Sequence, residues 1–330
     1  MHSIIKTWKP EVFQGSIRKK NYFEGWYYKL IDKDKLNTIA VIPGISLGNN
    51  RENSHAFVQV ADAVANDIQY YKYDMDDFKF SRKRFEVSIK DNCFSNKEIS
   101  LNLNNKDKTI HGSLEFNSII SFPKTLFNPG IMGPYSFIPF MECYHGIVNV
   151  HHEIKGIINI NNTATDFTGG YGYIEKDWGK SFPESWIWLQ SNHFEQGDVS
   201  VMFSAARIPW LHKFFTGFIS FIRIGDKFYR FATYTGAKVK LIDFNENMFE
   251  IHMEDSRHQL DLKAENSAGA VLKAPRNGMM DRDITESISA RIHVKFSKAD
   301  NSIIFEGLGV NTGMEIAGGI SELLSNKNNN

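Results

Sequence analysis

The middle of the chain carries two carboxylates among aromatic residues. Tyr173, Glu175 and Asp177 alternate along a strand-like segment, so their side chains share one face. Burial in apolar surroundings raises the pKa of a carboxyl group, because desolvation disfavours the charged form, and the group can then donate a proton at neutral pH. Nearby aromatic faces stabilise a developing cation. We therefore interpret Glu175 and Asp177 as candidate catalytic acids that protonate an alkene, after which an internal hydroxyl captures the carbocation.

A second strand-like segment follows a connection that contains Gly and Pro. Trp186, Trp188, Gln190 and Asn192 share one of its faces. If this face meets the face of Glu175, the result is an aromatic wall that holds two carboxylates and two amides, the usual composition of a small-molecule site. Two alternatives stay open. The rings could be ordinary core, and the acids could pair with basic side chains or accept backbone hydrogen bonds.

Strands are the elements that must position these side chains. Residues 22–31 begin a series of short apolar, β-branched segments punctuated by Asn, Asp, Gly and Ser, a pattern typical of antiparallel β structure. Glu24, Trp26 and Tyr28 share one face of the first segment. The first half of the chain has no long window with a 3.6-residue period. We therefore predict an all-β chain with little helix.

The two halves of the chain repeat a similar pattern at an offset of about 160 residues. Glu24-x-Trp26-x-Tyr28 corresponds to Glu184-x-Trp186-x-Trp188. Three further segments correspond at the same offset: 39–42 with 199–202, 56–60 with 216–220, and 68–71 with 228–231. We predict two tandem antiparallel β-barrel or sandwich domains, residues 1–160 and 161–320, and a disordered tail at 321–330.

An apolar, proline-rich connection at residues 122–145 interrupts the first domain. Its prolines remove ladder donors, so it cannot be a central strand. We expect it to pack against the barrel or to act as a lid. A transient contact with a membrane surface is the alternative.

Composition excludes several classes of protein. Lys+Arg and Asp+Glu both number 38, so there is no net charge to support nucleic-acid binding. Two cysteines suggest neither a disulfide scaffold nor a metal site, and the adjacent His151 and His152 point to opposite faces of a strand. Nucleotide-binding glycine motifs and a nucleophile elbow are absent. We expect no metal and no cofactor. The sequence shows no signal peptide or spanning segment, so we expect a cytoplasmic protein, with a peripheral membrane location as the alternative.

Four ordered blocks of the sequence resemble the tocopherol cyclase family: residues 23–29, 173–183, 186–192 and 314–319. The resemblance implies a lipocalin-like tandem β-barrel fold and a reaction in which a prenyl alkene is protonated and a ring phenol closes onto it. The sequence departs from plant cyclases at Asp177-Trp178. The residues that we assign to substrate binding are Glu24, Trp26, Tyr28, Tyr173, Trp178, Trp186, Trp188, Gln190, Asn192 and Glu315.

These observations lead to one leading hypothesis and three alternatives. The first is an enzyme that cyclises a prenylated quinol or a related isoprenoid, with Glu175 as the general acid and Asp177 second. The alternatives are an isoprenoid hydratase, a non-catalytic carrier of an apolar ligand, and a relative whose pocket is filled by its own side chains.

Overall fold

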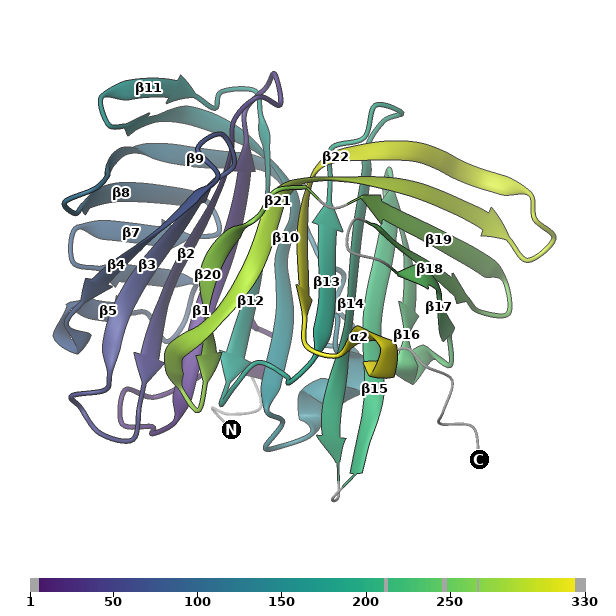
Figure 1. Ribbon diagram of the computed structural model, residues 1–330, viewed down its shortest axis with the longest axis horizontal. Coiled ribbons are helices and arrows are strands. Elements are labelled where there is room, and N and C mark those ends of the chain that lie inside the picture. The colour runs from purple at the N-terminus through teal and green to yellow at the C-terminus, as the bar shows by residue number, and fades with distance from the viewer. Residues whose placement is uncertain (1–5, 211–212, 245–247, 266, 324–330) are drawn as a thin grey trace. The chain divides into compact units, whose positions relative to one another are not determined.

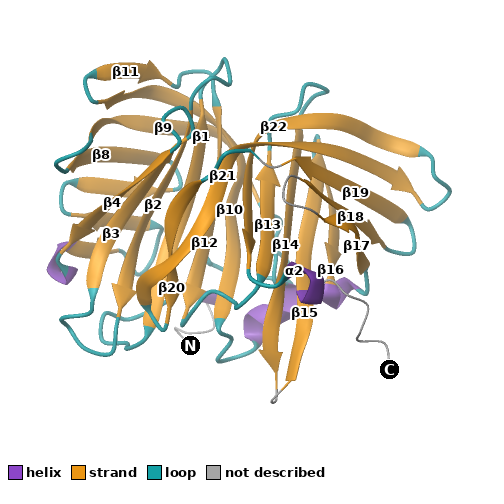
Figure 2. Cartoon of the chain, viewed as in Figure 1, coloured by secondary structure: helices purple, strands orange, loops and turns teal. Residues whose placement is uncertain are grey.

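The computed structural model describes residues 6–210, 213–244, 248–265 and 267–323. Strands make up most of these residues, and helix occurs only in short pieces such as α2 (Ile320–Leu323) (Figure 2). This confirms the prediction of an all-β chain with little helix. Among the described residues, no helix is both long and apolar enough to span a membrane.

The first antiparallel sheet has the strand order β4-β3-β2-β1-β12-β10-β9-β8-β7-β6-β5, and β11 pairs with β10 (Figure 1). Its strands are β1 (Tyr22–Ile31), β2 (Thr38–Leu47), β3 (His55–Asp62), β4 (Asp67–Tyr73), β5 (Phe78–Phe80), β6 (Glu86–Ile89), β7 (Asn92–Ser95), β8 (Glu98–Asn104), β9 (Thr109–Ser121), β10 (Cys143–Ile160), β11 (Thr163–Asp166) and β12 (Tyr171–Gly179).

The second antiparallel sheet has the order β16-β15-β14-β13-β22-β21-β19-β18-β17, and β20 pairs with β21. Its strands are β13 (Trp186–Ser191), β14 (Val199–Trp210), β15 (Lys213–Ile224), β16 (Lys227–Ala232), β17 (Lys238–Phe244), β18 (Met248–Glu254), β19 (His258–Glu265), β20 (Ala270–Arg276), β21 (Met279–Lys298) and β22 (Ile303–Ala317).

The two sheets repeat one topology. In the first sheet, β4, β3, β2 and β1 follow one another from one edge, and β12 comes next. In the second sheet, β16, β15, β14 and β13 follow one another in the same way, and β22 comes next. The segments matched at the offset of about 160 residues, such as 39–42 with 199–202, fall on these corresponding strands. The architecture of two tandem antiparallel sheets is therefore as predicted.

Contacts divide the chain into two units. One comprises Met1–Phe182 with Val271–Asp283, and the other Pro183–Ala270 with Ile284–Asn330. Residue 160, the expected boundary, ends β10 inside the first unit, because β12 is needed between β1 and β10. Domain limits in the sense of independent folding stay a prediction. The expected tail begins in α2, and its residues 324–330 lie outside the described part of the chain.

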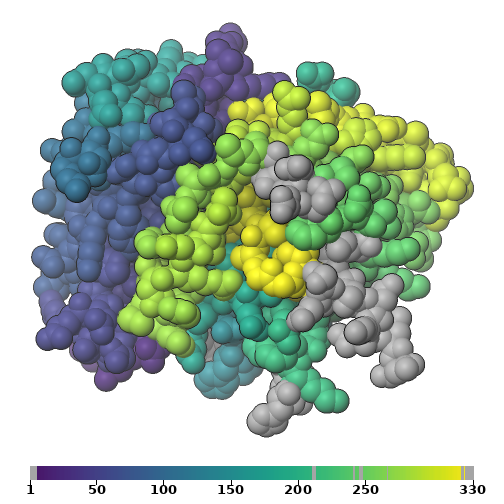
Figure 3. All heavy atoms as spheres, in the orientation of Figure 1, coloured from purple at the N-terminus to yellow at the C-terminus, as the bar shows by residue number. Residues whose placement is uncertain are grey.

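The first unit recruits a hairpin from late in the chain, residues 271–283 (Figures 1 and 3). In Figure 3 this yellow-green segment lies on the purple and blue strands of the unit. Its turn uses Asn277 and Gly278, both with positive φ, and a Cβ on Gly278 would lie 2.2 Å from the carbonyl oxygen of Leu47. Glycine is therefore required where the hairpin meets β2.

Aromatic side chains fill the interior of the first sheet's curl. Trp26 and Tyr28 are fully buried there, and the Trp26 ring stacks on Phe85 with centroids 5.5 Å apart. Strands with one buried face alternate accordingly, as β8 does residue by residue.

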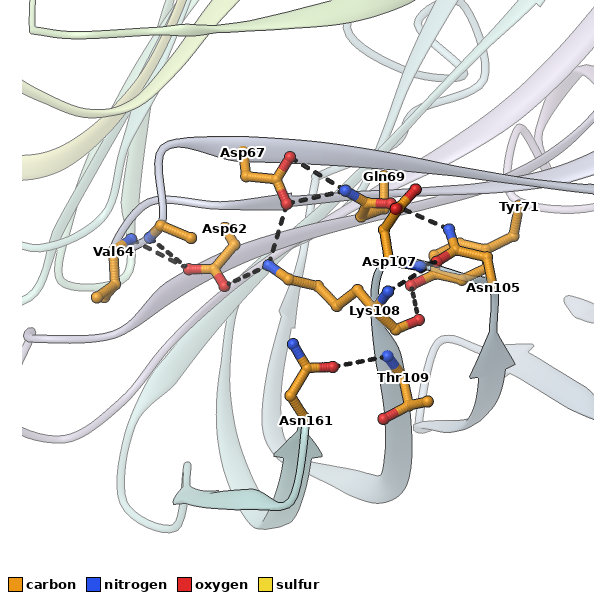
Figure 4. Close-up of polar contacts among 11 residues, drawn as sticks. Asp62, Val64, Asp67, Gln69, Tyr71, Asn105, Asp107, Lys108, Thr109 and Asn161 are labelled. Atoms are coloured by element: carbon orange, nitrogen blue, oxygen red, sulfur yellow. Dashed lines mark hydrogen bonds and ion pairs between the residues drawn. The ribbon is translucent and has the colours of Figure 1, made fainter.

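An ion-pair network ties together two hairpins that are distant in the strand order (Figure 4). Lys108, in the β8–β9 turn, places Nζ 3.0 Å from Asp62 and 3.2 Å from Asp67 at the β3–β4 turn. Asn105 donates to Gln69 at 3.0 Å, also from β8–β9 to β4. These contacts hold the sheet in its curled shape.

Candidate active site

The register of β1, β12 and β10 separates the predicted site residues onto two faces. Paired residues in an antiparallel sheet share a face. Glu24 pairs with Trp178, and Tyr28 pairs with Ile174, on the face that lines the filled interior. Glu175 pairs with Tyr27 on the opposite face. The structure therefore does not bring Trp26, Tyr28 and Trp178 to the same face as Glu175 and Asp177.

A cluster of titratable side chains, which we call the acid cluster, forms on that opposite face. His145 on β10 faces Asp177 in register, and its Nδ1 lies 2.9 Å from Asp177 Oδ1. His145 Nε2 lies 3.5 Å from Glu175 Oε2. Tyr173 donates its hydroxyl to the same Glu175 oxygen at 2.7 Å. The imidazole thus stands between the two carboxylates that the sequence singled out.

Burial sets the protonation of the groups around these carboxylates. Tyr173 is fully buried, and desolvation, with the negative charge of Glu175 second, raises the pKa of its phenol well above the usual value. Burial, followed by the charge of Asp177, likewise raises the pKa of the Cys143 thiol. Tyr173 therefore remains a hydrogen-bond donor, and Cys143 remains a thiol that is poorly suited to nucleophilic attack.

The acid cluster can move a proton or bind a cation. Glu175 is 4% exposed, whereas the side chains of His145 and Asp177 keep 13% and 21% exposure. Ligand atoms from these three residues lie within 4.8 Å of one another, so they could hold a metal ion. The expectation of a metal-free protein remains a prediction.

Glu24 makes a structural ion pair inside the curl of the first sheet. Its carboxylate contacts Lys176 Nζ and accepts the backbone amides of Gln14 and Gly15 at 2.7 and 2.9 Å. Burial lowers the pKa of Lys176 to about 8, and its ammonium lies 4.7 Å from the Trp26 ring centroid. This is the pairing that the sequence left open as an alternative for Glu24, and it fastens the N-terminal segment to the sheet.

The remaining candidates form a separate group in the second unit. Trp186 donates Nε1 to Glu315 Oε2 at 2.8 Å, and Trp188 faces Glu315 in register. They lie opposite the face of Ile187, which belongs to that unit's core. Three further residues of this group are nearly or fully buried: Gln190, Asn192 and Glu286, which pairs in register with Glu315.

The two strands whose aromatic faces we expected to meet, β12 and β13, do not pair with each other as a hairpin. β12 pairs with β1 and β10 in the first sheet, whereas β13 pairs with β14 and β22 in the second. Proximity of Trp186 and Trp188 to Glu175 stays a prediction.

Sequence reasoning missed His145 and Glu286. His145 closes the stretch that we treated as a proline-rich connection, and only its pairing with Asp177 in the sheet gives it a role. In the sequence, Glu286 is one polar residue in an alternating strand. The pairing of β21 with β22 places it opposite Glu315. A search for acids and histidines on predicted strands would have included both residues without ranking them.

Comparisons with known proteins place the tandem antiparallel sheets in a known family. The tocopherol cyclase-like family matches residues 99–319. The chain is 27% identical over 142 residues to a probable chloroplastic tocopherol cyclase of Oryza sativa subsp. japonica, a match that covers 42% of this chain and 30% of the relative. It therefore spans less than a third of that relative's length.

Two solved structures share the fold at low identity. CghA with Sch210972 superposes with a TM-score of 0.56 at 9% identity, over 90% of this chain and 89% of the other. Kievitone hydratase from Nectria haematococca gives 0.52 at 9% identity, over the same shares.

Fold and site thus define a protein of two tandem antiparallel β-sheets in which two carboxylates flank an imidazole. The chain belongs to the tocopherol cyclase-like family.

Proposed function

We propose that the protein cyclises a prenylated quinol or a related isoprenoid by proton transfer from Glu175. The observation that carries this proposal is the position of His145 between Asp177 and Glu175, with Tyr173 bonded to Glu175. A buried carboxyl that accepts a hydrogen bond on Oε2 can carry its acidic proton on Oε1. His145 and Asp177 are placed to return a proton to it.

The proposed reaction is an isomerisation. Glu175 gives its proton to the less substituted alkene carbon, so a C–H bond forms from the π electrons and the carboxyl O–H bond breaks. The quinol oxygen attacks the resulting tertiary cation, a C–O bond forms, and the phenolic proton passes to the acid cluster. The step needs neither an oxidant nor a water molecule, and it restores the acid.

The test compares conservative variants on a prenylated hydroquinone. Glu175→Gln is expected to lower kcat by at least about a hundredfold, because it removes the transferable proton while keeping the shape. His145→Asn and Asp177→Asn should reduce turnover less. Glu153→Gln, an exposed carboxylate on β10, is the control and should keep full activity.

Mass spectrometry of the product separates the alternatives. A cyclase yields an isomer of unchanged mass, a hydratase adds one water, and a carrier returns the ligand unaltered. Full turnover by Glu175→Gln would reject the assignment of the acid. If EDTA abolished the activity of the wild-type protein, the proposal of proton donation would be rejected in favour of a metal-dependent reaction at the same residues.

A further inference from the structure

Four large apolar side chains project from the connection between β9 and β10. They are Leu126, Phe127, Phe137 and Phe140, and the exposed fractions reach 74% at Phe127 and 98% at Phe140. We call this group the apolar tip. Single exposed apolar residues are ordinary, but a group of them on one segment marks an interaction site.

Buried side chains and a 3-10 turn fix the segment that carries the apolar tip. Ile131 is fully buried and Met132 nearly so. The 3-10 turn η2 (Gly133–Phe137) ends with the backbone amide of Ile138 bonded to Tyr135 at 3.1 Å. A packed loop thus presents the exposed rings, and the expectation of burial holds for Phe122 and for the middle of the connection.

Basic side chains lie beside the apolar tip. Trp8 donates Nε1 to the carbonyl of Thr125 at 3.1 Å and packs its ring 5.2 Å from that of Phe137. The next residue, Lys9, extends Nζ to the carbonyl oxygen of Lys83 at 3.3 Å. The N-terminal segment therefore connects the apolar tip to the basic run 82–84.

More positive charge gathers at the same place. Lys124, on the same connection as the apolar tip, donates Nζ to the carbonyl of Trp8 at 3.0 Å and lies 3.0 Å from Glu11. Apolar rings flanked by cations match the chemistry of an anionic lipid surface, where rings enter the acyl boundary and cations meet the head groups.

The apolar tip also adjoins the acid cluster. The loop ends where β10 begins, and the backbone amide of His145 lies 3.1 Å from the sulfur of Met132. On the other face of the sheet, Tyr144 donates its hydroxyl to the carbonyl of Ile138 at 2.8 Å and stacks on Trp178, which fixes the loop to β10 and β12. A molecule that leaves a bilayer at the apolar tip would therefore emerge close to the candidate acids.

We propose that the apolar tip and its neighbouring basic residues dock the protein onto an anionic lipid bilayer. Docking itself is independent of the proposed function, whereas delivery of an apolar substrate to Glu175 rests on it.

Flotation with two kinds of vesicle tests the docking. Wild-type protein is expected to float with vesicles of phosphatidylcholine and phosphatidylserine, and more weakly with phosphatidylcholine alone. Phe127→Ser with Phe140→Ser should lower the partition coefficient by at least about tenfold on both. Arg82→Gln with Lys83→Gln should weaken binding only to the anionic vesicles, and added salt should do the same.

Matched controls come from exposed apolar residues elsewhere in the first unit. Leu36→Ser with Val64→Ser removes side chains that are 73% and 69% exposed, and it should leave flotation unchanged. The proposal is overturned if the wild-type protein floats with neither kind of vesicle. It is also overturned if the Phe127/Phe140 and Leu36/Val64 double variants lower flotation equally. It is also overturned if the apolar tip instead mediates self-association, seen as a dimer that Phe127→Ser with Phe140→Ser converts to a monomer.

The two proposals fail separately. Glu175→Gln should float as wild type does, although it turns over no substrate. The phenylalanine double variant should turn over detergent-dispersed substrate normally and lose activity only when the substrate is supplied in vesicles.

Discussion

At the scale of single residues, the chain uses buried titratable groups in two ways. In the acid cluster, Glu175, His145 and Asp177 contact one another, and we propose that this arrangement transfers a proton. Glu24 and Lys176 instead form a fully buried ion pair inside the curl of the first sheet. Residue type did not separate these roles, since both glutamates stand among aromatic rings. The strand face on which each side chain lies separates them.

His152 gives a residue-scale prediction about pH. It is fully buried against the Phe116 ring, at 4.2 Å between centroids, and burial lowers its pKa to about 3. Below the unfolded-state pKa of about 6.5, the unfolded chain binds a proton that the folded chain does not, so stability falls as the pH falls toward 3. Between about pH 7 and about pH 4.5, His152 should account for about 2 kcal/mol of the loss in the free energy of unfolding.

Urea unfolding at both pH values measures this effect. His152→Gln should lose less stability on acidification than wild type, whatever its stability at neutral pH. His111→Gln, which replaces an exposed histidine on β9, is the control and should follow the wild type. Equal acid sensitivity of His152→Gln and wild type would show that His152 is not held neutral in the fold.

At the scale of elements, two irregularities determine where β10 places its side chains. The register shifts between Ile147 and Asn149 and again between Asn149 and His152. Simple alternation would put Asn149 on the face of His145. The bulge turns it inward, where it donates to the carbonyl of Asn96 at 3.0 Å. The acid cluster therefore occupies only the first part of β10, before the bulge.

The N-terminal segment gives the element-scale prediction. Glu24→Gln leaves the Lys176 charge without its buried partner, and the free energy of unfolding should fall by about 3 kcal/mol. The Gln14 and Gly15 amides, which donate to Glu24, should exchange hydrogen faster. Glu86→Gln breaks an exposed pair with Arg84 and should cost less than about 1 kcal/mol. Unchanged amide exchange in Glu24→Gln would contradict the anchoring role.

At the scale of the whole molecule, segments far apart in the chain complete the first unit. Gln59 on β3 donates to the carbonyl of Lys273 at 3.0 Å and accepts its amide at 3.0 Å. Ser46 donates to the carbonyl of Gly278 at 2.8 Å. The first sheet thus holds a hairpin encoded more than two hundred residues later, which a division of the sequence into halves could not anticipate.

Gln59 gives the prediction at this scale. Gln59→Ala removes two hydrogen bonds and leaves backbone groups of Lys273 unpaired, so the free energy of unfolding should drop by about 2 kcal/mol. Limited trypsin digestion should then cut after Lys273 sooner than in wild type. Gln259→Ala on β19, in the second unit, serves as the control. If digestion after Lys273 is no faster, the side chain does not hold the hairpin.

The sequence by itself determined the all-β class and the tandem repeat, and it singled out Glu175 and Asp177 as candidate acids. The first follows from local alternation, the second from a constant offset and the third from residue types in ordered blocks. All three patterns can be recognised from the order of residues alone. Only the tertiary structure decided that Glu24 and Trp26 face away from Glu175, and that His145 joins the acids. Strand partners and bulges set those relations, because a side chain's face and neighbours depend on hydrogen-bond register between segments that the sequence leaves far apart.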